Sequence, residues 1–426
     1  MKTIHLNRKT KRTNIKFATF DVETWGLGGS FAFGVCYSNK GTKVFFNKQE
    51  MIEYMLSRSF KNYIWYSHNI KYDISIIFGK EIFNKFKAII SSGRIIQLTY
   101  NEKGYNIYLR DSMNLFNTSL DKIGKLIGYE KLKTPLKFKI HPSFVDEINK
   151  LISSQDYDTL YETYGLTKED IEEYQKGIDY TITKEDIDYC IRDCEVLYKA
   201  IEYFIQFISQ FNIRLRPTIG ANALAIFQSM QTEKESINVS GYDFLFRKSY
   251  YGGRTELFIE SSDKKLNYYD FNSLYPSVMF FEKYPDPESL AYTNNPTIDL
   301  IENYEGVSYV KVSIPEDMFY PPLPYKLNDK LIFPVGTIKG WYNHNELRMA
   351  MKYGAKIKRI YKTVYATKTC NLFKEYIQSM YNLRLKYKKE KNDIMAQICK
   401  LLMNSLYGKF GQKNVKREIG TIADNK

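Results

Sequence analysis

Alternating hydrophobic and polar positions predict a series of short strands in about the first 120 residues of the chain. Turn-forming residues separate the strand-like runs, which are Ile15–Phe20, Phe31–Tyr37, Thr42–Phe46, Ile95–Tyr100 and Tyr105–Leu109. The apolar residues then change to helical spacing, as at Ile187 and Ile191, and this spacing predicts mostly helix over residues 145–215.

The second half of the chain repeats this change of pattern. A strand-like run at Asn267–Phe271 precedes a long segment, residues 285–334, in which repeated prolines predict irregular structure. From Cys370 to Gly408 the spacing is helical again, with a strongly basic stretch at residues 384–391. Together the regions predict an α+β protein of at least two domains, as expected for 426 residues.

Composition narrows the classes of protein that fit this pattern. Hydrophobic residues make up 44% and charged residues 26% of the chain, as in ordinary globular proteins. No apolar run is long enough for a membrane helix or a secretory signal, so we expect no membrane partner. The net charge of +14 favours a polyanionic partner such as nucleic acid, although a solvated lysine-rich surface would look the same.

The cysteines indicate a reducing compartment. Their number is odd and their spacing irregular, so no disulfide framework is expected, and we predict a cytoplasmic location, in the host cell if the protein is viral. Cys190 and Cys194 lie one helical turn apart without a nearby histidine, and we interpret them as packing residues.

Acidic residues recur at positions suited to one metal site. Asp21 and Glu23 lie two apart at the end of a strand-like run, so their side chains share a face. Asp73 follows a polar cluster, and Asp193 lies four residues after Tyr189 on one helical face. Each motif alone is more often structural. Together the four carboxylates are the hard ligands that paired Mg²⁺ or Mn²⁺ ions need.

The order of these motifs resembles that in a known family. Asp-x-Glu, then Asn-x-x-x-Asp from Asn69, then Tyr-x-x-x-Asp from Tyr189 resemble the three proofreading exonuclease motifs of DnaQ-like enzymes and family B DNA polymerases. The resemblance implies a ribonuclease-H-like domain that hydrolyses DNA from a 3′ end with two metal ions. It assigns the four carboxylates to metal binding and Tyr189 to positioning the attacking water. It assigns His68, Asn69 and Tyr72 to holding a single-stranded primer end.

Two shorter matches point to the same family. Ser112-Met113 with Phe116 resembles a DNA-binding motif of the exonuclease domain, with Met in place of Leu. Lys133-x-x-Leu136 resembles a Lys-x-x-hydrophobic motif whose lysine supports exonuclease catalysis. Lys131, Lys137 and Lys139 lie in the same stretch, so the sequence does not fix Lys133 as the catalytic lysine.

Residues 268–276, Tyr-Tyr-Asp-Phe-Asn-Ser-Leu-Tyr-Pro, contain one carboxylate followed by a predicted turn into a helix. The string resembles polymerase motif A of family B, Asp-x-x-Ser-Leu-Tyr-Pro. The resemblance implies that Asp270 binds the catalytic metal ions. It also implies that Tyr275 lies under the sugar of the incoming nucleotide.

Lys400, Asn404 and Tyr407 lie on one stripe of a predicted helix, with Leu402 and Leu406 on another face. The string Lys-x-x-x-Asn-Ser-x-Tyr-Gly resembles motif B of the polymerase fingers. By that resemblance Lys400 contacts the triphosphate, and Asn404 and Tyr407 frame the nascent base pair. Arg384 and Lys388 are candidates for a second phosphate contact, with a solvated basic face as the equal alternative.

A linker motif and an insertion favour the protein-primed branch of the family, found in bacteriophages and linear plasmids. Tyr250-Tyr251-Gly252-Gly253 resembles the Tyr-x-Gly-Gly motif, in which Tyr250, Gly252 and Gly253 would contact template DNA. Residues 301–365 resemble the insertion that contacts a terminal protein primer. The first acidic motif begins only 21 residues from the N-terminus, which leaves no room for the extra domain of RNA-primed relatives.

The motifs divide the chain into five expected regions. These are an exonuclease domain (1–215), the first part of a palm (216–300), the insertion (301–365), fingers (366–411) and the start of a further palm or thumb portion (412–426). The expected ligands are primer–template and single-stranded DNA, dNTPs, a terminal protein, and Mg²⁺ or Mn²⁺. The Tyr-x-Asp-Thr-Asp-Ser motif that supplies a second palm carboxylate in the family is absent from the sequence. We therefore expect poor polymerisation unless that motif is restored.

Three interpretations remain open from the sequence. The first is a split or partial polymerase that a second polypeptide completes. The second is a stand-alone 3′→5′ exonuclease with a palm remnant, and the third is a non-catalytic module that binds DNA or terminal protein.

Overall fold

The computed structural model describes residues 2–5, 15–26, 29–91, 93–102, 104–231, 236–239, 241–271 and 273–412. The chain forms two compact units, one of residues 9–226 with 380–426 and the other of residues 1–8 with 227–379. All but the first residue of the predicted region 412–426 lies outside the described residues. In the described part of the chain, no helix is both long enough and apolar enough to cross a membrane.

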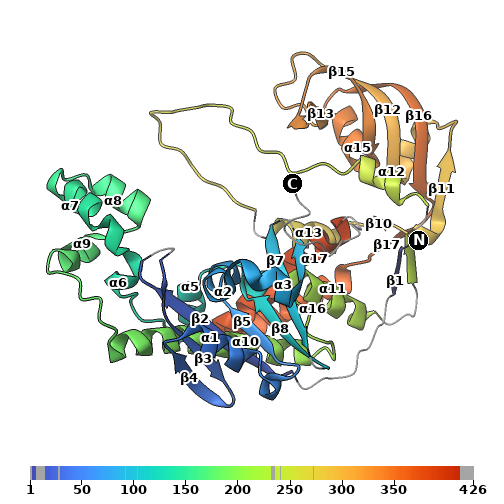
Figure 1. The fold of residues 1–426 in the computed structure, drawn as a ribbon. Coiled ribbons are helices and arrows are strands. Elements are labelled where there is room, and N and C mark those ends of the chain that lie inside the picture. Colours follow the sequence, from blue (N-terminus) through green and yellow to red (C-terminus); the bar gives the residue numbers. More distant parts are fainter. Residues whose placement is uncertain are drawn as a thin grey trace. The chain divides into compact units, whose positions relative to one another are not determined.

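A seven-stranded mixed sheet organises the unit of residues 9–226 and 380–426 (Figure 1). Strand β2 pairs in parallel with β5, and β5 with β8, while the remaining pairs are antiparallel. The order across the sheet is β4 (Gly41–Phe45), β3 (Phe31–Ser38), β2 (Phe17–Thr24), β5 (Ile64–Ser67), β8 (Tyr105–Asp111), β7 (Arg94–Glu102) and β6 (Phe86–Ser91).

The central strands are buried because helices cover them. Every residue of β5 is buried, and in β2 all but Asp21 are, which is typical of parallel strands inside a covered sheet. Helix α1 (Lys48–Met55) packs on β3, and α2 (Ile70–Phe78) packs on β2, β5 and β8. Helices α3 (Ile82–Lys85), α4 (Met113–Phe116) and α5 (Leu120–Ile127) are shorter or follow the last strand. Helix α10 (Lys184–Ser209) packs on β2 and β3. It begins at a capping box formed by Thr183 and Asp186.

The predicted helical region 145–215 is confirmed, although short loops divide it. Its other helices are α7 (Val145–Ser153), α8 (Tyr157–Tyr164) and α9 (Lys168–Tyr174), preceded by α6 (Leu136–Lys139). The helical spacing predicted from Cys370 onward is also confirmed, by α16 (Lys374–Lys389) and α17 (Asp393–Gly411). Helix α17 packs against α10 and α5 within the same unit.

The unit of residues 1–8 and 227–379 is built around a four-stranded antiparallel sheet. Its order is β11 (Leu290–Thr293), β16 (Lys356–Ala366), β12 (Glu305–Ile314) and β15 (Gly336–Asn343). Helices α14 (Ile298–Asn303) and α15 (His344–Lys352) pack on the face formed by Val310, Val312 and Ile314. The irregular structure predicted for residues 285–334 is therefore wrong in part, because β11 and β12 form within it.

Short elements complete the two units. Strand β1 (Lys2–His5) pairs with β9 (Ser236–Val239), β10 (Tyr284–Pro285) with β17 (Thr369–Cys370), and β13 (Tyr325–Leu327) with β14 (Lys330–Ile332). Helices α11 (Ile219–Met230) and α12 (Asp243–Lys248) precede the Tyr-x-Gly-Gly linker, and α13 (Leu274–Phe281) begins within the motif A string.

One sequence prediction fails here for a physical reason. The run Asn267–Phe271 forms no strand, and its residues are exposed. A β-strand needs a hydrogen-bonded neighbour, and no described strand pairs with this run, so its hydrophobic side chains remain in solvent.

Candidate active site

The first two carboxylates of the site lie on β2, the middle strand of the sheet. Asp21 and Glu23 are two residues apart on this strand, so both side chains leave the same face. Glu23 is buried, and Asp21 is partly buried beneath α10. The sheet therefore holds the two carboxylates close together on a rigid element.

The third carboxylate, Asp73, comes from the neighbouring parallel strand. Helix α2 starts just after β5, and Asp73 lies in its first turn. The hydroxyl of Ser67, the last residue of β5, donates to Asp73 Oδ2, and the backbone amide of Val22 also hydrogen-bonds to this carboxylate. Because Val22 lies between Asp21 and Glu23, this bond brings the three acidic groups together.

Helix α10 supplies the fourth carboxylate and a phenol. Asp193 and Tyr189 are one turn apart and both are buried. The ammonium of Lys131 lies 2.8 Å from Asp193 Oδ2 and 3.3 Å from the Tyr189 hydroxyl. Thr134 Oγ1 lies 3.0 Å from the same hydroxyl, so the phenol has two polar neighbours from one loop.

Burial and mutual repulsion change the acidity of these groups. Burial raises the pKa of Asp21 well above its usual range, and the neighbouring Asp73, Glu23 and Asp193 raise it further. Burial, followed by the charge of Asp193, raises the pKa of Glu23 to about 8. Burial raises the pKa of Asp73 to about 7, even though the Ser67 hydroxyl opposes the shift. Without a counter-charge the cluster therefore holds protons near neutral pH.

Lys131 offsets only part of this negative charge. Burial lowers the pKa of its ammonium, but the charges of Asp193, Asp21 and Glu23 outweigh burial and raise the pKa overall. Among the described residues, the single ammonium of Lys131 thus interacts with the carboxylates of Asp193, Asp21 and Glu23. Such an imbalance is typical of a site built for divalent cations.

The side chains offer ligand atoms that fit such ions. The Oδ1 atom of Asp193 is buried and has no hydrogen-bond partner among the described residues. Ligand atoms of Asp21, Glu23 and Cys190 all lie within 4.8 Å of one another. Carboxylate oxygens are the ligands that Mg²⁺ and Mn²⁺ prefer, so the donor set suits these ions.

Lys133 does not lie where the sequence motif predicted. It is exposed, and its ammonium lies 2.9 Å from Glu173 Oε2 and 3.7 Å from Asp170 Oδ1, away from the cluster. The side chain of Lys131 instead reaches Asp193 and Tyr189. The prediction of Lys133 as the lysine of the site is therefore corrected to Lys131.

The residues predicted to hold a DNA end lie around the start of α2. Asn69 is exposed, its backbone is left-handed with φ of 66°, and its backbone N–H donates to Asp111 Oδ1. Tyr72 is half-buried, and its hydroxyl is hydrogen-bonded to Thr24 Oγ1 next to Glu23. Burial lowers the pKa of His68 to about 4, which keeps this ring neutral.

Ser112 differs from its expected surface position. Its side chain is fully buried, and its hydroxyl donates to Ser67 O and contacts His68 Nδ1 at 2.9 Å. Ser112 therefore contacts His68 from the interior, and its buried side chain is not accessible to DNA.

The predicted polymerase residues of motif A lie in the unit of residues 1–8 and 227–379. Asp270 is exposed in the segment without regular structure, and Tyr275 is half-exposed in the first turn of α13. Tyr250 is also exposed, and Gly252 and Gly253 have open space around them. Tyr251, which was not singled out, anchors this linker by stacking on Tyr342 at 6.1 Å between ring centroids.

The predicted motif B stripe is present on α17. Lys400 and Tyr407 are exposed and Asn404 is partly exposed, while Leu402 and Leu406 are buried. Lys388 is exposed near the end of α16. Arg384 on α16 lowers the pKa of the buried Cys399 thiol, against a larger rise due to burial, so the two helices lie side by side.

Sequence reasoning missed three residues of the carboxylate cluster. Thr134 and Ser67 carry no motif, and their roles depend on distances that only the fold sets. Cys190 packs in the hydrophobic cluster that contains Phe33 and Val35, which confirms its predicted packing role. Its thiol is buried but also lies 3.8 Å from Asp21 Oδ2, on the helical turn between Tyr189 and Asp193.

Comparisons with known proteins agree with these motifs. Bacillus phage phi29 DNA polymerase is 24% identical over 407 residues, which cover 86% of this chain and 64% of that protein. Its structure with primer–template DNA superposes with a TM-score of 0.69 and 19% identity, covering 94% of this chain and 68% of the phage chain. The mixed α+β, multidomain fold is therefore that of the phage polymerase over this part.

Fungal relatives match a larger share of the sequence. A protein named "Probable DNA polymerase" from Ascobolus immersus is 28% identical over 437 residues, and one from Neurospora intermedia is 30% identical over 423 residues. The matches cover 95% and 90% of this chain, but only 36% and 43% of those proteins. The chain thus spans less than half the length of these two relatives.

A family model described as DNA polymerase type B, organellar and viral, matches residues 55–426. The resemblance that the motifs indicated is therefore confirmed at the level of the family. Because the match covers most of the sequence, this chain belongs to the type B DNA polymerases of the organellar and viral family.

Proposed function

We propose that this chain carries the 3′→5′ exonuclease and the first part of the polymerase site of a protein-primed viral or plasmid DNA polymerase. The observation that supports the exonuclease most is the convergence of four carboxylates with Tyr189 and Lys131. The parallel order of β2, β5 and β8 under α10 supports a ribonuclease-H-like domain over residues 1–215.

The carboxylates would hold the metal ions, and Asp21, Glu23, Asp73 and Asp193 would each give oxygen ligands. Such ions make a bound water nucleophilic and stabilise charge on the phosphate. Tyr189 holds its hydroxyl between Lys131 and Thr134, where it can orient a water by a hydrogen bond. Burial raises the pKa of Asp193, and the ammonium of Lys131 opposes this rise and limits the repulsion between the carboxylates.

The strand to be cleaved would approach along the start of α2. Asn69 and the ring of Tyr72 are at least partly exposed there, next to Asp73, and an aromatic ring can stack on an unpaired base. His68 is neutral and can donate or accept a hydrogen bond. Phi29 DNA polymerase has been solved with single-stranded DNA, with primer–template DNA and with nucleotides, and we propose the same classes of ligand here.

The polymerase half is proposed as an incomplete site. Asp270 would bind metal ions, Tyr275 would select the sugar, and the stripe on α17 would receive the dNTP. The exposed Asp270 has no second palm carboxylate in this sequence, since the Tyr-x-Asp-Thr-Asp-Ser motif is absent. We propose that the rest of the polymerase, or a second polypeptide, supplies that motif and the thumb.

The remaining regions are proposed by analogy with the family. Residues 216–300 would begin the palm, 301–365 would contact a terminal protein, and 366–411 would form the fingers. We propose a cytoplasmic location, in the host cell if the protein is viral.

A stand-alone exonuclease is the second candidate. The observation that favours it is the contrast between the two acidic sites: the exonuclease carboxylates are clustered and mostly buried, whereas Asp270 is exposed in a segment without regular structure. A non-catalytic module that binds DNA or terminal protein is the third.

The test is degradation of a single-stranded oligonucleotide labelled at its 5′ end. We expect shortening from the 3′ end with Mg²⁺ or Mn²⁺, and its loss with EDTA or in Asp21→Ala and Asp193→Ala. If the intact chain does not shorten the oligonucleotide, only the interpretation as a non-catalytic binding module remains. Primer extension only after a chain with the missing motif is added would select the incomplete polymerase over the stand-alone exonuclease.

A further inference from the structure

One face of the four-stranded sheet is open and positively charged. Strand β12 alternates between its two faces: Val310, Val312 and Ile314 pack on the helices, so Tyr309 and Lys311 point to the other side. Helix α12 covers only one end of that side, where Leu245 packs with Val307 and Trp341. Beyond this end the face is exposed.

Three cations lie in a row across this open face. Lys311 on β12 is directly opposite Lys339 on β15 and directly opposite Arg359 on β16. All three residues are exposed, and none forms an ion pair with a carboxylate in the part of the chain that the structure describes. Like charges directly opposite one another destabilise a sheet, so a bound anion would relieve this repulsion.

Aromatic rings lie beside the cations on the same face. Tyr309 stacks on Trp341 at 5.5 Å and contacts Tyr361 at 5.4 Å between ring centroids. The ammonium of Lys339 lies 4.2 Å from the centre of the Tyr361 ring, and the guanidinium of Arg359 lies 4.9 Å from it. Both tyrosines are partly exposed, so their rings become more accessible when Lys339 moves towards an anion.

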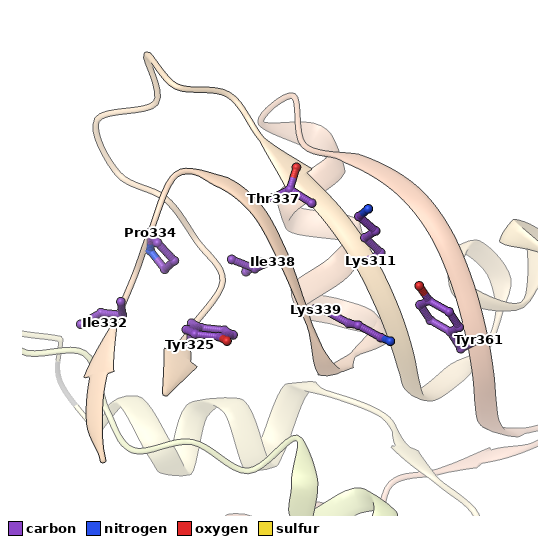
Figure 2. Close-up of a pocket in the computed structure, with 8 residues that line it drawn as sticks. All are labelled: Lys311, Tyr325, Ile332, Pro334, Thr337, Ile338, Lys339 and Tyr361. Atoms are coloured by element: carbon purple, nitrogen blue, oxygen red, sulfur yellow. The ribbon is translucent and has the colours of Figure 1, made fainter. Parts of the chain in front are cut away.

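The hairpin of β13 and β14 turns this face into a groove of about 550 Å³. Figure 2 shows Lys311, Lys339 and Tyr361 along the strands of the sheet, with Tyr325, Ile332 and Pro334 across from them. The groove is therefore charged on one wall and largely apolar on the other.

We propose that this open face of the sheet binds single-stranded DNA, at a site separate from the carboxylate cluster. A row of unpaired cations suits phosphates, and flat rings beside them suit unpaired bases, whose faces are free to stack. An acidic protein segment would use the cations but would gain nothing specific from the rings. Duplex DNA keeps its base faces covered, so it too would use only the charges.

The test is binding of a fluorescein-labelled thymidine oligonucleotide of about 20 nucleotides to the full chain, in EDTA to prevent degradation. Fluorescence anisotropy is measured over a series of salt concentrations. In the triple variant Lys311→Ala, Lys339→Ala, Arg359→Ala we expect weaker binding. The slope of log affinity against log salt should fall by about 2, since each phosphate on a single strand contributes about 0.7.

A matched triple variant controls for net charge. Lys283, Lys352 and Lys368 are exposed lysines of the same unit outside the groove, and their replacement by Ala should leave the slope nearly unchanged. Equal losses in the two triple variants would overturn the proposal. Unchanged far-ultraviolet circular dichroism and melting temperature would show that both variants fold.

Tyr361→Leu tests the stacking independently of charge. We expect it to weaken binding of the thymidine oligonucleotide severalfold but not that of an abasic oligonucleotide of equal length. Equal effects on both, or equally strong competition by polyglutamate, would overturn the proposal in favour of an acidic protein partner. Degradation of 3′ ends, assayed separately with Mg²⁺, should persist in all these variants, so failure here is distinct from failure of the exonuclease.

Discussion

Lys131 Nζ lies 2.8 Å from Asp193 Oδ2, although 62 positions separate the two residues in the sequence. The contact joins the loop after α5 to the middle of α10 and places a positive charge against a cluster of carboxylates. The same ammonium lies 5.1 Å from the centre of the Tyr189 ring. Lys131 therefore acts on both groups that α10 brings to the site.

Replacement of this lysine should impair the exonuclease. In Lys131→Met we expect the rate of 3′-end degradation to fall about 10²–10³-fold, the usual loss when one preorganised charged group is removed from an active site. Lys131→Arg should recover part of the rate because the charge remains. The measurement is single-turnover degradation of a labelled single strand with Mg²⁺.

Lys133→Met is the matched control, because it removes a lysine two positions away. Its ion pair with Glu173 is at the surface, where such pairs contribute about 0–1 kcal/mol to stability. We expect a rate close to that of the intact chain. A loss in Lys133→Met with little loss in Lys131→Met would show that the sequence motif, and not the distance, identifies the lysine.

Stability without metal ions should fall as the pH rises. The pKa of Glu23 is raised from 4.5 to about 8 and that of Asp73 from 3.8 to about 7, so between these values the folded state binds more protons than the unfolded state. The contribution of both groups is therefore full below about pH 4 and is lost as the pH rises through 7 and 8. Thermal unfolding in EDTA should show a melting temperature that decreases from about pH 6 to about pH 8.5.

Added Mg²⁺ and the variant Glu23→Gln test whether the carboxylate cluster causes this pH dependence of stability. Mg²⁺ should raise the melting temperature most at high pH, because binding needs ionised carboxylates. Glu23→Gln should reduce both the pH dependence in EDTA and the response to Mg²⁺. If Glu23→Gln has the same pH dependence as the intact chain, the carboxylate cluster is not its source.

The thiol of Cys190 should make the site respond to soft metal ions. It lies 3.8 Å from Asp21 Oδ2, and thiolate sulfur binds Cd²⁺ more strongly than Mg²⁺. We expect Cd²⁺ to produce the ultraviolet charge-transfer absorption of a metal–thiolate bond, and Cys190→Ser to abolish it. Excess Mn²⁺ should compete.

Cys194→Ser is the matched control for that experiment. Cys194 lies one turn along the same helix and is equally buried, but its sulfur lies 3.8 Å from the backbone oxygen of Val35. The absorption should persist in this variant. If the absorption persists in Cys190→Ser, a cysteine other than Cys190 binds Cd²⁺.

Periodicity and motif spacing predicted the elements that carry the site, but not every contact between them. The alternation around Asp21 and the helical spacing of Tyr189 and Asp193 are local properties, and both are present in the structure. Local sequence pattern does not show whether Lys131 or Lys133 reaches the carboxylate cluster. Which of two nearby lysines reaches a carboxylate depends on the path of a loop, and that path is set by packing between distant elements.

In the second half of the chain, prolines do not prevent strand formation. Strand β12 forms among them because its hydrogen bonds go to β15 and β16, which lie later in the chain. The opposite case is Asn267–Phe271, where a strand-like composition has no pairing partner among the described strands. Local pattern cannot tell these cases apart, since the partner of a strand is a long-range property.

The segment around Asp270 should be the most readily cleaved of the described loops. Residues 252–271 are exposed and form no helix or strand, and proteases prefer such extended backbone. We expect trypsin to cut after Lys264 and Lys265 before it cuts after exposed helical lysines such as Lys352. Mass spectrometry of a brief digest identifies the sites.

The same cleavage also tests how the polymerase site is completed. If a polypeptide with the Tyr-x-Asp-Thr-Asp-Ser motif packs beside Asp270, the run Asn267–Phe271 can pair as a strand and the segment loses its flexibility. Addition of that polypeptide should then slow cleavage after Lys265 at least about tenfold, because cleavage requires local opening and tenfold corresponds to about 1.4 kcal/mol of added local stability. Cleavage after Lys352 should change little. Equal rates with and without the added polypeptide, together with an active exonuclease, would favour the stand-alone nuclease.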